Sequence, residues 1–388
     1  GVLPGTGGLT RVVDKRKVRK DRADIFATRQ EGIRGQTAVD WGLVDGIAKA
    51  SVLMDDARER GQAAAKTSSR PSDAEGVALT PLRRTDSEDA IEYTTVSAQI
   101  NRDERRADIV ITVPDEAPPA DAAAALAQGA EYWPLRLTRE LDDLILRLRT
   151  NDQHVGLWVF RVQGDHDRAL AFDAQLGELA DDWFINETRQ YLKRTLKRLD
   201  VTSRSLFSII EPGSAFDGFL AEIALASDRQ YMLEGVYEDV DPDATPATLT
   251  LTDSNFGPFP MGNGLTRLES RFYGHDEQVK AAEGKKGTAL DATAADELGL
   301  VTMALDDIDF EDELRIVLEE RASLSPDALT GMEANHRFVG PETMETKIFG
   351  RLTAWQNWIF YRPNASGPEG ALRRFGSGER AAYDMKRV

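Results

Sequence analysis

The sequence contains no cysteine, which excludes disulfide bonds and thiolate metal sites within these 388 residues. Histidine is also scarce, and the four histidines show no spacing typical of metal ligands. They are His154, His166, His275 and His336. We therefore expect no metal site in this chain.

The sequence has no long apolar run, and it has fewer positive than negative side chains. No stretch is apolar for long enough to cross a bilayer, and no secretory signal pattern is recognisable. The 48 Lys and Arg residues face 66 Asp and Glu residues, for a net charge of −18. A nucleic-acid-binding protein needs clustered cations to neutralise phosphates. We expect a cytoplasmic protein that binds neither nucleic acid nor membrane.

One short segment departs from this acidic balance. Residues 11–22 contain seven Lys and Arg residues, opposed only by Asp14 and Asp21. Such a run is typical of a solvated helix face, and it is also suited to binding the phosphates of a nucleotide. The sequence leaves both interpretations open.

One stretch of sequence occurs twice. The first eleven residues, Gly1 to Arg11, return in altered form at 257–267 with six identical positions. In nearly the same register, 37–44 matches 293–301 with one residue added. The spacing of 256 residues is the length of a domain and too long for a solenoid repeat. We infer a duplicated domain, and we expect the first copy to begin part-way through.

The composition along the chain predicts four regions. Residues 1–66 form the end of the first module, and a stretch at 67–89 rich in Ser, Pro, Asp and Arg is the best linker candidate. Residues 90–308 form a second, complete module, and 309–388 form a C-terminal helical region.

The predicted elements favour an α/β fold with a mostly parallel sheet covered by helices. Strands are expected at 43–47, in a hairpin of 91–98 and 107–113, and at 155–162, 206–210, 230–233 and 248–251. Helices are expected at 25–27, 38–41, 54–66, 122–128, 134–149, 185–199, 216–226 and 309–322, with a long one after Pro341.

The helix after Pro341 is unusually aromatic. Its apolar residues include Trp355 and Trp358, and a surface of this kind needs a partner. It either packs on its own domain or forms a lid or dimer contact. Our prediction is a homodimer through Trp355 and Trp358.

The first repeat resembles the crotonase (enoyl-CoA hydratase/isomerase) superfamily. The resemblance rests on the turn Gly1-Val2-Leu3-Pro4-Gly5-Thr6-Gly7-Gly8, followed by Arg11, Ala38 and Gly42-Leu43-Val44. It implies the spiral of ββα units of the crotonase fold and an acyl-CoA substrate whose thioester enolate is stabilised by two backbone N–H groups. Over the whole chain, the double-length architecture and the Trp-rich tail resemble a narrower family of ring-cleaving lyases that act on aromatic-derived CoA thioesters.

The resemblance assigns site residues at the start of the chain. Leu3, Pro4 and Gly5 would line the substrate, and the Gly5 backbone N–H would hold a water at the reacting centre. The family's two catalytic glutamates lie upstream of this turn, so we expect them to be absent here and the chain alone to be inactive. No metal or redox cofactor is implied, and CoA is part of the substrate.

The second module offers a weaker pair of candidates. By the same resemblance, Glu222 and Asp253 fall at the positions of the two catalytic glutamates. However, Gly218-Phe219-Leu220 replaces the glycines that let a backbone N–H approach the thioester, and Met261 stands in the place of Gly5. We favour a degenerate second module in which both carboxylates are structural. An ordinary enoyl-CoA hydratase or isomerase, and a scaffold that only binds CoA, remain alternatives.

Overall fold

The computed structural model describes residues 4–70, 73 and 75–387. These residues form two compact units, Gly1–Ala74 (unit 1) and Glu75–Val388 (unit 2). The division falls within the stretch predicted as a linker. The end of that stretch is not linker, however, because β1 (Thr85–Asp86) pairs with β2 (Ala90–Glu92) in the sheet of unit 2.

Unit 1 consists of short helices. They are α1 (Gly8–Thr10), the π-helical turn η1 (Arg11–Lys15), α2 (Lys20–Thr28), α3 (Gly35–Asp40) and α4 (Leu53–Ala65). The prediction of a strand at 43–47 is wrong. Residues 43–45 form bends, and no strand among the described residues pairs with this stretch. Among the described residues of unit 1, only Val18 and Ala38 are buried hydrophobics.

The second of the two sequence matches, 37–44 with 293–301, has the same local structure in both copies. In unit 1, α3 ends where Gly42 adopts a φ of 76°, and the Leu43 N–H donates to the Ala38 carbonyl. In unit 2, α12 (Ala292–Glu297) ends at Gly299 with a φ of 68°, and the Leu300 N–H donates to the Ala295 carbonyl. Only glycine adopts this left-handed conformation without strain, which explains why it recurs at both helix ends.

An eight-stranded mixed sheet forms the centre of unit 2, in the order β1-β2-β3-β4-β5-β6-β8-β11. Its first three pairings are antiparallel and the rest are parallel. The remaining strands of this sheet are β3 (Val96–Asn101), β4 (Arg106–Thr112), β5 (Leu157–Gln163), β6 (Ser205–Ile210), β8 (Arg229–Leu233) and β11 (Met303–Leu305). The predicted hairpin and buried strands are therefore present.

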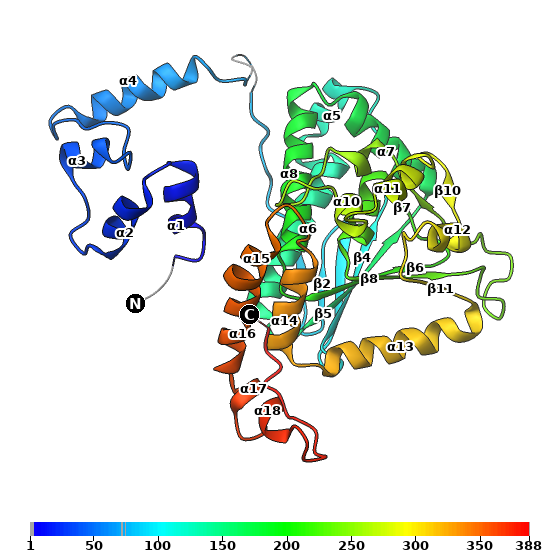
Figure 1. Ribbon diagram of the computed structural model, residues 1–388. Helices are drawn as coiled ribbons and strands as arrows, with labels where there is room; N and C mark the ends of the chain where they lie inside the picture. Colours follow the sequence, from blue (N-terminus) through cyan, green and yellow to red (C-terminus); the bar gives the residue numbers. More distant parts are fainter. Residues whose placement is uncertain (1–3, 71–72, 74, 388) are drawn as a thin grey trace. The chain divides into compact units, whose positions relative to one another are not determined.

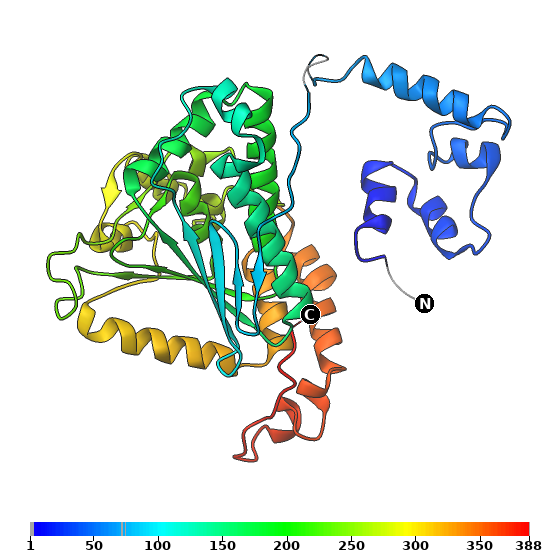
Figure 2. The ribbon, with the colours of Figure 1, turned by 180° about the vertical axis from the view of Figure 1, so that it is seen from behind.

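Alternation along the strands divides the core of unit 2 into two layers. On β5, Trp158 and Phe160 pack into the larger cluster, and Leu157 and Val159 pack into the smaller one. Helices α6 (Trp133–Asn151) and α8 (Trp183–Asp200) contribute to the larger cluster, and α13 (Asp307–Ser323) runs along the opposite face (Figures 1 and 2). The leucines predicted at helical spacing in α6 and α8 are buried in this layer.

Several segments between the strands differ from expectation. The helix predicted at 216–226 begins instead as a strand and a short turn, because β7 joins a second sheet of order β10-β9-β7. Asp165 caps the start of a helix, α7, which the sequence did not predict. These segments are β7 (Phe216–Asp217), η3 (Gly218–Leu220), α9 (Ala221–Ala226), β9 (Leu249–Thr250), β10 (Ala289–Leu290) and α7 (His166–Glu178).

The other helices of unit 2 are shorter or lie in the C-terminal region. The long helix predicted after Pro341 begins at Met344 and contains a π-helical turn, η5. These elements are α5 (Ala122–Gln128), η2 (Gly129–Glu131), η4 (Asp253–Phe256), α10 (Arg267–Arg271), α11 (Asp276–Glu283), α14 (Pro326–His336), α15 (Met344–Lys347), η5 (Ile348–Leu352), α16 (Thr353–Phe360), α17 (Pro363–Ser366) and α18 (Ala371–Arg374).

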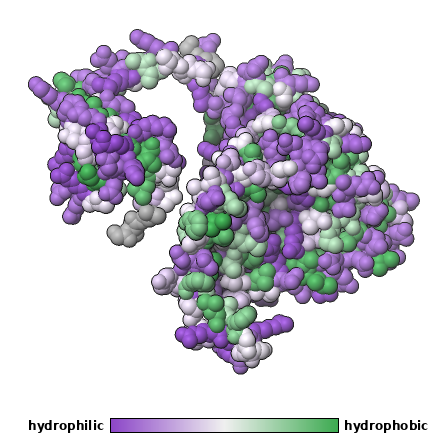
Figure 3. Space-filling model, viewed as in Figure 1, coloured by the Kyte–Doolittle hydropathy of each residue, from purple (hydrophilic) through white to green (hydrophobic). Residues whose placement is uncertain are grey.

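The C-terminal helices leave large apolar side chains exposed. Phe349 is 72% exposed and Leu352 is 47% exposed, and hydrophobic surface is visible over α15 and α16 (Figure 3). Trp355 and Trp358 are only half-buried and contact each other edge to face. The Trp355 side chain also lies against Gly331 of α14, so α16 packs partly on its own unit.

Candidate functional site

The turn expected to line the substrate lies at the start of unit 1. Leu3 is outside the described residues, whereas Pro4 and Gly5 are both exposed. The turn is closed by a hydrogen bond from the Gly7 N–H to the Pro4 carbonyl at 3.2 Å. No atom lies within 4 Å of where a Cβ on Gly5 would stand, so packing within the described chain does not require a glycine there.

The basic segment of unit 1 is used largely for local contacts. Arg16 pairs with Asp45 at 2.9 Å, and Arg19 pairs with Asp21 at 2.6 Å. Arg22 donates to the Asp40 carbonyl. These contacts favour neither the solvated-face interpretation nor the phosphate-binding one, because each arginine remains accessible.

Glu222, the first candidate of the second module, is buried at the start of α9. Its two carboxylate oxygens accept hydrogen bonds from Asn255 Nδ2 at 2.8 Å and from Arg267 Nη1 at 2.6 Å. Arg267 also donates from Nε and Nη2 to Asp200, at 3.0 and 2.8 Å. All four side chains are almost fully buried. Glu222 is therefore part of a closed polar network.

This network contains two carboxylates and one guanidinium. Burial raises the pKa of Glu222 and of Asp200, and the nearby Arg267 counteracts this only in part. Desolvation is the main cause of both shifts, and the charge of Asp200 raises the pKa of Glu222 further. A buried ion pair of this kind is poorly suited to proton exchange with a substrate.

Asp253, the second candidate, is in a different environment. Its side chain is 91% exposed and pairs with Lys286 Nζ at 2.6 Å. The structure thus places one member of the expected pair in the core and the other in solvent. It does not bring them together across a pocket.

The Phe219 N–H, which the resemblance places near an oxyanion donor, already has a partner. The Phe219 N–H donates to Asp173 Oδ1 at 2.8 Å, and Asp173 is buried on α7. A Cβ on Gly218 would stand 2.3 Å from Asp173 Cγ, and Gly218 has a φ of 56°. The glycine therefore admits the carboxylate rather than a substrate carbonyl. Burial raises the pKa of Asp173.

Aromatic side chains fill the space beside this turn. Trp133 lies 4.6 Å from Phe172 and 5.9 Å from Phe219, between ring centroids, and all three are buried. Met261 is buried as well. Phe219 and Met261 therefore place buried side chains at positions where the resemblance would have glycine.

His166, the first residue of α7, forms a separate polar group with Asp217 and Thr248. His166 Nδ1 lies 2.6 Å from Asp217 Oδ2, and its Nε2 lies 3.4 Å from Thr248 Oγ1. Asp217 is fully buried, and its hydrogen bond to His166 raises the pKa of the imidazole. This group links α7, β7 and the chain before β9.

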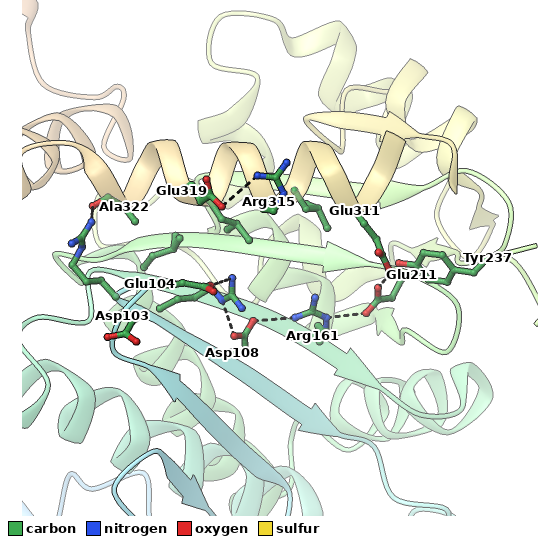
Figure 4. Close-up of a pocket in the computed structure, with 15 residues that line it drawn as sticks. Asp103, Glu104, Asp108, Arg161, Glu211, Tyr237, Glu311, Arg315, Glu319 and Ala322 are labelled. Carbon is green, nitrogen blue, oxygen red and sulfur yellow. Dashed lines mark hydrogen bonds and ion pairs between the residues drawn. The ribbon is translucent and has the colours of Figure 1, made fainter. Parts of the chain in front are cut away.

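A cavity of about 540 Å³ lies between α13 and the outer face of the sheet (Figure 4). Asp108, Arg161 and Glu211 form a row across β4, β5 and the end of β6, with Arg161 bonded to Glu211 at 2.8 Å and to Asp108 at 3.3 Å. The Tyr237 hydroxyl donates to Glu211 at 3.0 Å. These groups satisfy one another, so the row stabilises the sheet face and presents no free nucleophile.

No protein-family model matches the chain. Benzoyl-CoA-dihydrodiol lyase of Aromatoleum evansii is 52% identical over 388 residues, which are all of this chain and 69% of the lyase. The chain belongs to the benzoyl-CoA-dihydrodiol lyase family. The identity extends through both units, so the duplicated architecture is shared with a lyase.

Solved structures related to the lyase-family chain confirm the crotonase-like fold. An enoyl-CoA hydratase of Geobacillus kaustophilus covers 79% of this chain and 100% of its own, with a TM-score of 0.52 and 13% identity. An enoyl-CoA hydratase/isomerase of Cupriavidus metallidurans covers 74% of this chain and 95% of its own, with a TM-score of 0.51 and 15% identity. At these identities the likeness establishes fold alone.

Two features of this lyase-family chain escaped the sequence analysis. Asp173 was not recognised as the partner of the Phe219 N–H, because the two are 46 residues apart and no motif joins them. Asp217 was not recognised as the partner of His166 for the same reason. Among the described residues, no group of His, Asp and Glu is placed to hold a metal ion, and no helix is long and apolar enough to span a membrane.

Proposed function

We propose that this protein is a ring-cleaving lyase that acts on 2,3-epoxy-2,3-dihydrobenzoyl-CoA. The products would be 3,4-dehydroadipyl-CoA semialdehyde and formate, and consumption of two water molecules balances the reaction. The observation that carries the proposal is the 52% identity to benzoyl-CoA-dihydrodiol lyase over every residue of the chain.

The chemistry is assigned to the first module. In this proposal Leu3, Pro4 and Gly5 contact the acyl-CoA substrate, and the Gly5 N–H positions a water. The reaction needs base chemistry and enolate stabilisation but no metal or redox cofactor. The exposed, uncrowded backbone at Gly5 supports this role, because a substrate can approach it closely.

The second module serves as a scaffold in this proposal. The support is the occupied Phe219 N–H, together with the separation of buried Glu222 from exposed Asp253. A dimer contact through α15 and α16, including Trp355 and Trp358, completes the proposed assembly. The exposed apolar side chains of α15–η5–α16 support it.

Formate release from the epoxide tests the proposal, measured with the protein produced from its complete gene. Turnover is expected there, and Glu222→Gln and Asp253→Asn should change kcat less than two-fold. Hydration of a 2-enoyl-CoA without formate release would instead identify a hydratase. CoA-thioester binding without any turnover would identify a scaffold.

A further inference from the structure

A smaller pocket of unit 2, of about 280 Å³, lies among α10, the end of α14 and the connection from α9 to β8. One part of its wall is apolar and includes Leu225, Met261 and Val339. The other part is charged. It belongs neither to the proposed catalytic turn nor to the cavity under α13.

Most of the charges in this wall are paired. Asp200 is bound by Arg267. Asp228 is bound by Arg337, which donates to both carboxylate oxygens at 2.8 and 2.6 Å. Arg337 directs its remaining donor nitrogen to the Thr202 carbonyl. Each carboxylate of the wall is therefore bound by a guanidinium, although Arg267 also binds the buried Glu222.

Arg271 is the exception. It donates from Nε to the Gly299 carbonyl at 2.5 Å and from Nη1 to the Gln230 side-chain oxygen at 2.8 Å. Both acceptors are neutral, and among the described residues Arg271 forms no ion pair with a carboxylate. Burial without a counter-charge lowers the pKa of Arg271. Arg271 thus lines the pocket without a carboxylate partner among the described residues.

The free donors of Arg271 are suited to a planar anion. A guanidinium has five N–H donors in a fixed fork, and the two neutral acceptors leave Nη2 and one N–H of Nη1 for a ligand. His336, also in the wall, is exposed at the end of α14 and offers a second nitrogen. A single guanidinium with free donors matches a monoanion better than a dianion such as phosphate.

We propose that this pocket binds a small organic carboxylate, with its carboxylate on Arg271 and its apolar body against Leu225, Met261 and Val339. Pockets for small molecules typically combine an apolar wall with a few placed polar groups in this way. The site is an addition to the proposed lyase activity and does not depend on it.

Titration of the 388-residue protein with benzoate, acetate and inorganic phosphate tests the proposal, by isothermal calorimetry and by the shift in thermal unfolding midpoint. Benzoate should bind saturably and more tightly than acetate, because of its apolar ring, and phosphate should bind more weakly than benzoate. Arg271→Gln should raise the Kd for benzoate at least ten-fold. Arg315→Gln, which removes an exposed arginine of α13, is the matched control and should change it less than two-fold.

Val339→Phe is a second variant, for the case that Arg271→Gln does not fold. The larger side chain fills the apolar side of the pocket, so the Kd for benzoate should also rise at least ten-fold. The absence of saturable carboxylate binding would overturn the proposal. Equal affinity of the wild type and the folded variants would do the same. Tighter binding of phosphate than of benzoate would overturn the assignment of an organic monoanion.

Discussion

Single residues explain why the two copies of the repeat differ in chemistry. Nothing crowds the backbone at Gly5, whereas Met261 at the matching position is buried. In the same module the Phe219 N–H is taken by Asp173. The carboxylate at Glu222 is held by Arg267. The Phe219 N–H, Glu222 and Asp253 thus all have internal partners, which supports the proposed structural role of the second module.

Arg267 is the residue whose loss should be most damaging. Arg267→Leu leaves Asp200 and Glu222 buried without their shared cation, and we expect a loss of about 3–5 kcal/mol in the free energy of unfolding. Glu222→Gln leaves one carboxylate with one guanidinium, so its cost should be about 1 kcal/mol or less. Urea unfolding of the 388-residue protein measures both. Equal costs for the two variants would contradict the surplus-charge interpretation of this network.

His166 should make stability depend on pH. Its folded pKa is raised, chiefly by the hydrogen bond to Asp217, with Asp165 and Asp167 also nearby. Relative to an unfolded pKa of about 6.5, the contribution is complete below that pH and is lost as the pH rises through the folded pKa. The difference in unfolding free energy between the wild type and His166→Gln should therefore be larger in mild acid than in mild alkali. His275→Gln, at an exposed histidine, should show a smaller change, and a pH-independent difference for His166 would refute the prediction.

At the scale of elements, short turns determine where a backbone N–H points and where a helix ends. The η3 turn directs the Phe219 N–H onto α7, and the cap at Gly299 ends α12 as Gly42 ends α3. The same local signal thus produces the same helix end in both units. What differs is the element that packs against each turn.

The η3 turn can be tested at Gly218. Gly218→Ala adds both a strained backbone and a clash with Asp173, whereas Gly213→Ala adds strain alone, because nothing lies within 4 Å of its Cβ position. Alanine in the left-handed region costs about 1–2 kcal/mol, and overpacking adds about 1–3 kcal/mol. Thermal or urea unfolding should rank Gly218→Ala clearly below Gly213→Ala. Similar losses would show that the contact with Asp173 is relaxed at little cost.

The C-terminal helices can be tested by separating exposed from packed aromatics. Phe349→Ser should convert the proposed dimer to a monomer in sedimentation equilibrium while preserving the fold, because this side chain is 72% exposed. Trp355→Ala should also lower stability, since Trp355 packs on Gly331. Phe375→Ser, at a residue 90% exposed elsewhere in the C-terminal region, is the control. A wild-type monomer, or a Phe349→Ser dimer, would rule out this contact.

At the scale of the whole molecule, the two units bury very different numbers of hydrophobic residues. Unit 2 encloses both hydrophobic clusters, whereas the described part of unit 1 buries two hydrophobic residues and leaves Ile47, Leu53 and Met54 largely exposed. Unit 2 therefore has the interior expected of a stable domain. The residues assigned to catalysis belong to the unit with the smaller interior.

The 388-residue polypeptide by itself should not release formate from the epoxide. The reason is that the resemblance requires two glutamates at the proposed site, and neither Glu222 nor Asp253 is placed to replace them. A discontinuous formate assay against the protein from the complete gene checks this. Turnover by the 388-residue chain at a comparable rate would refute it.

The sequence by itself predicted the crotonase-like fold class and most buried strands and helices, and it is the ground for the proposed duplication. These follow from local periodicity and from glycines at turns, which act over a few residues. It mistook 43–47 for a strand and 216–226 for one helix, because only a neighbouring strand decides whether a short apolar run joins a sheet.

Only the tertiary structure decided which polar groups meet. Arg267 reaches Glu222 and Asp200 across 45 and 67 residues of sequence, and Asp173 reaches the Phe219 N–H across 46. Contacts over such separations depend on how helices are laid on the sheet, which no local pattern encodes. That packing paired the Phe219 N–H with Asp173, and it left Arg271 beside an apolar wall with only neutral acceptors among the described residues.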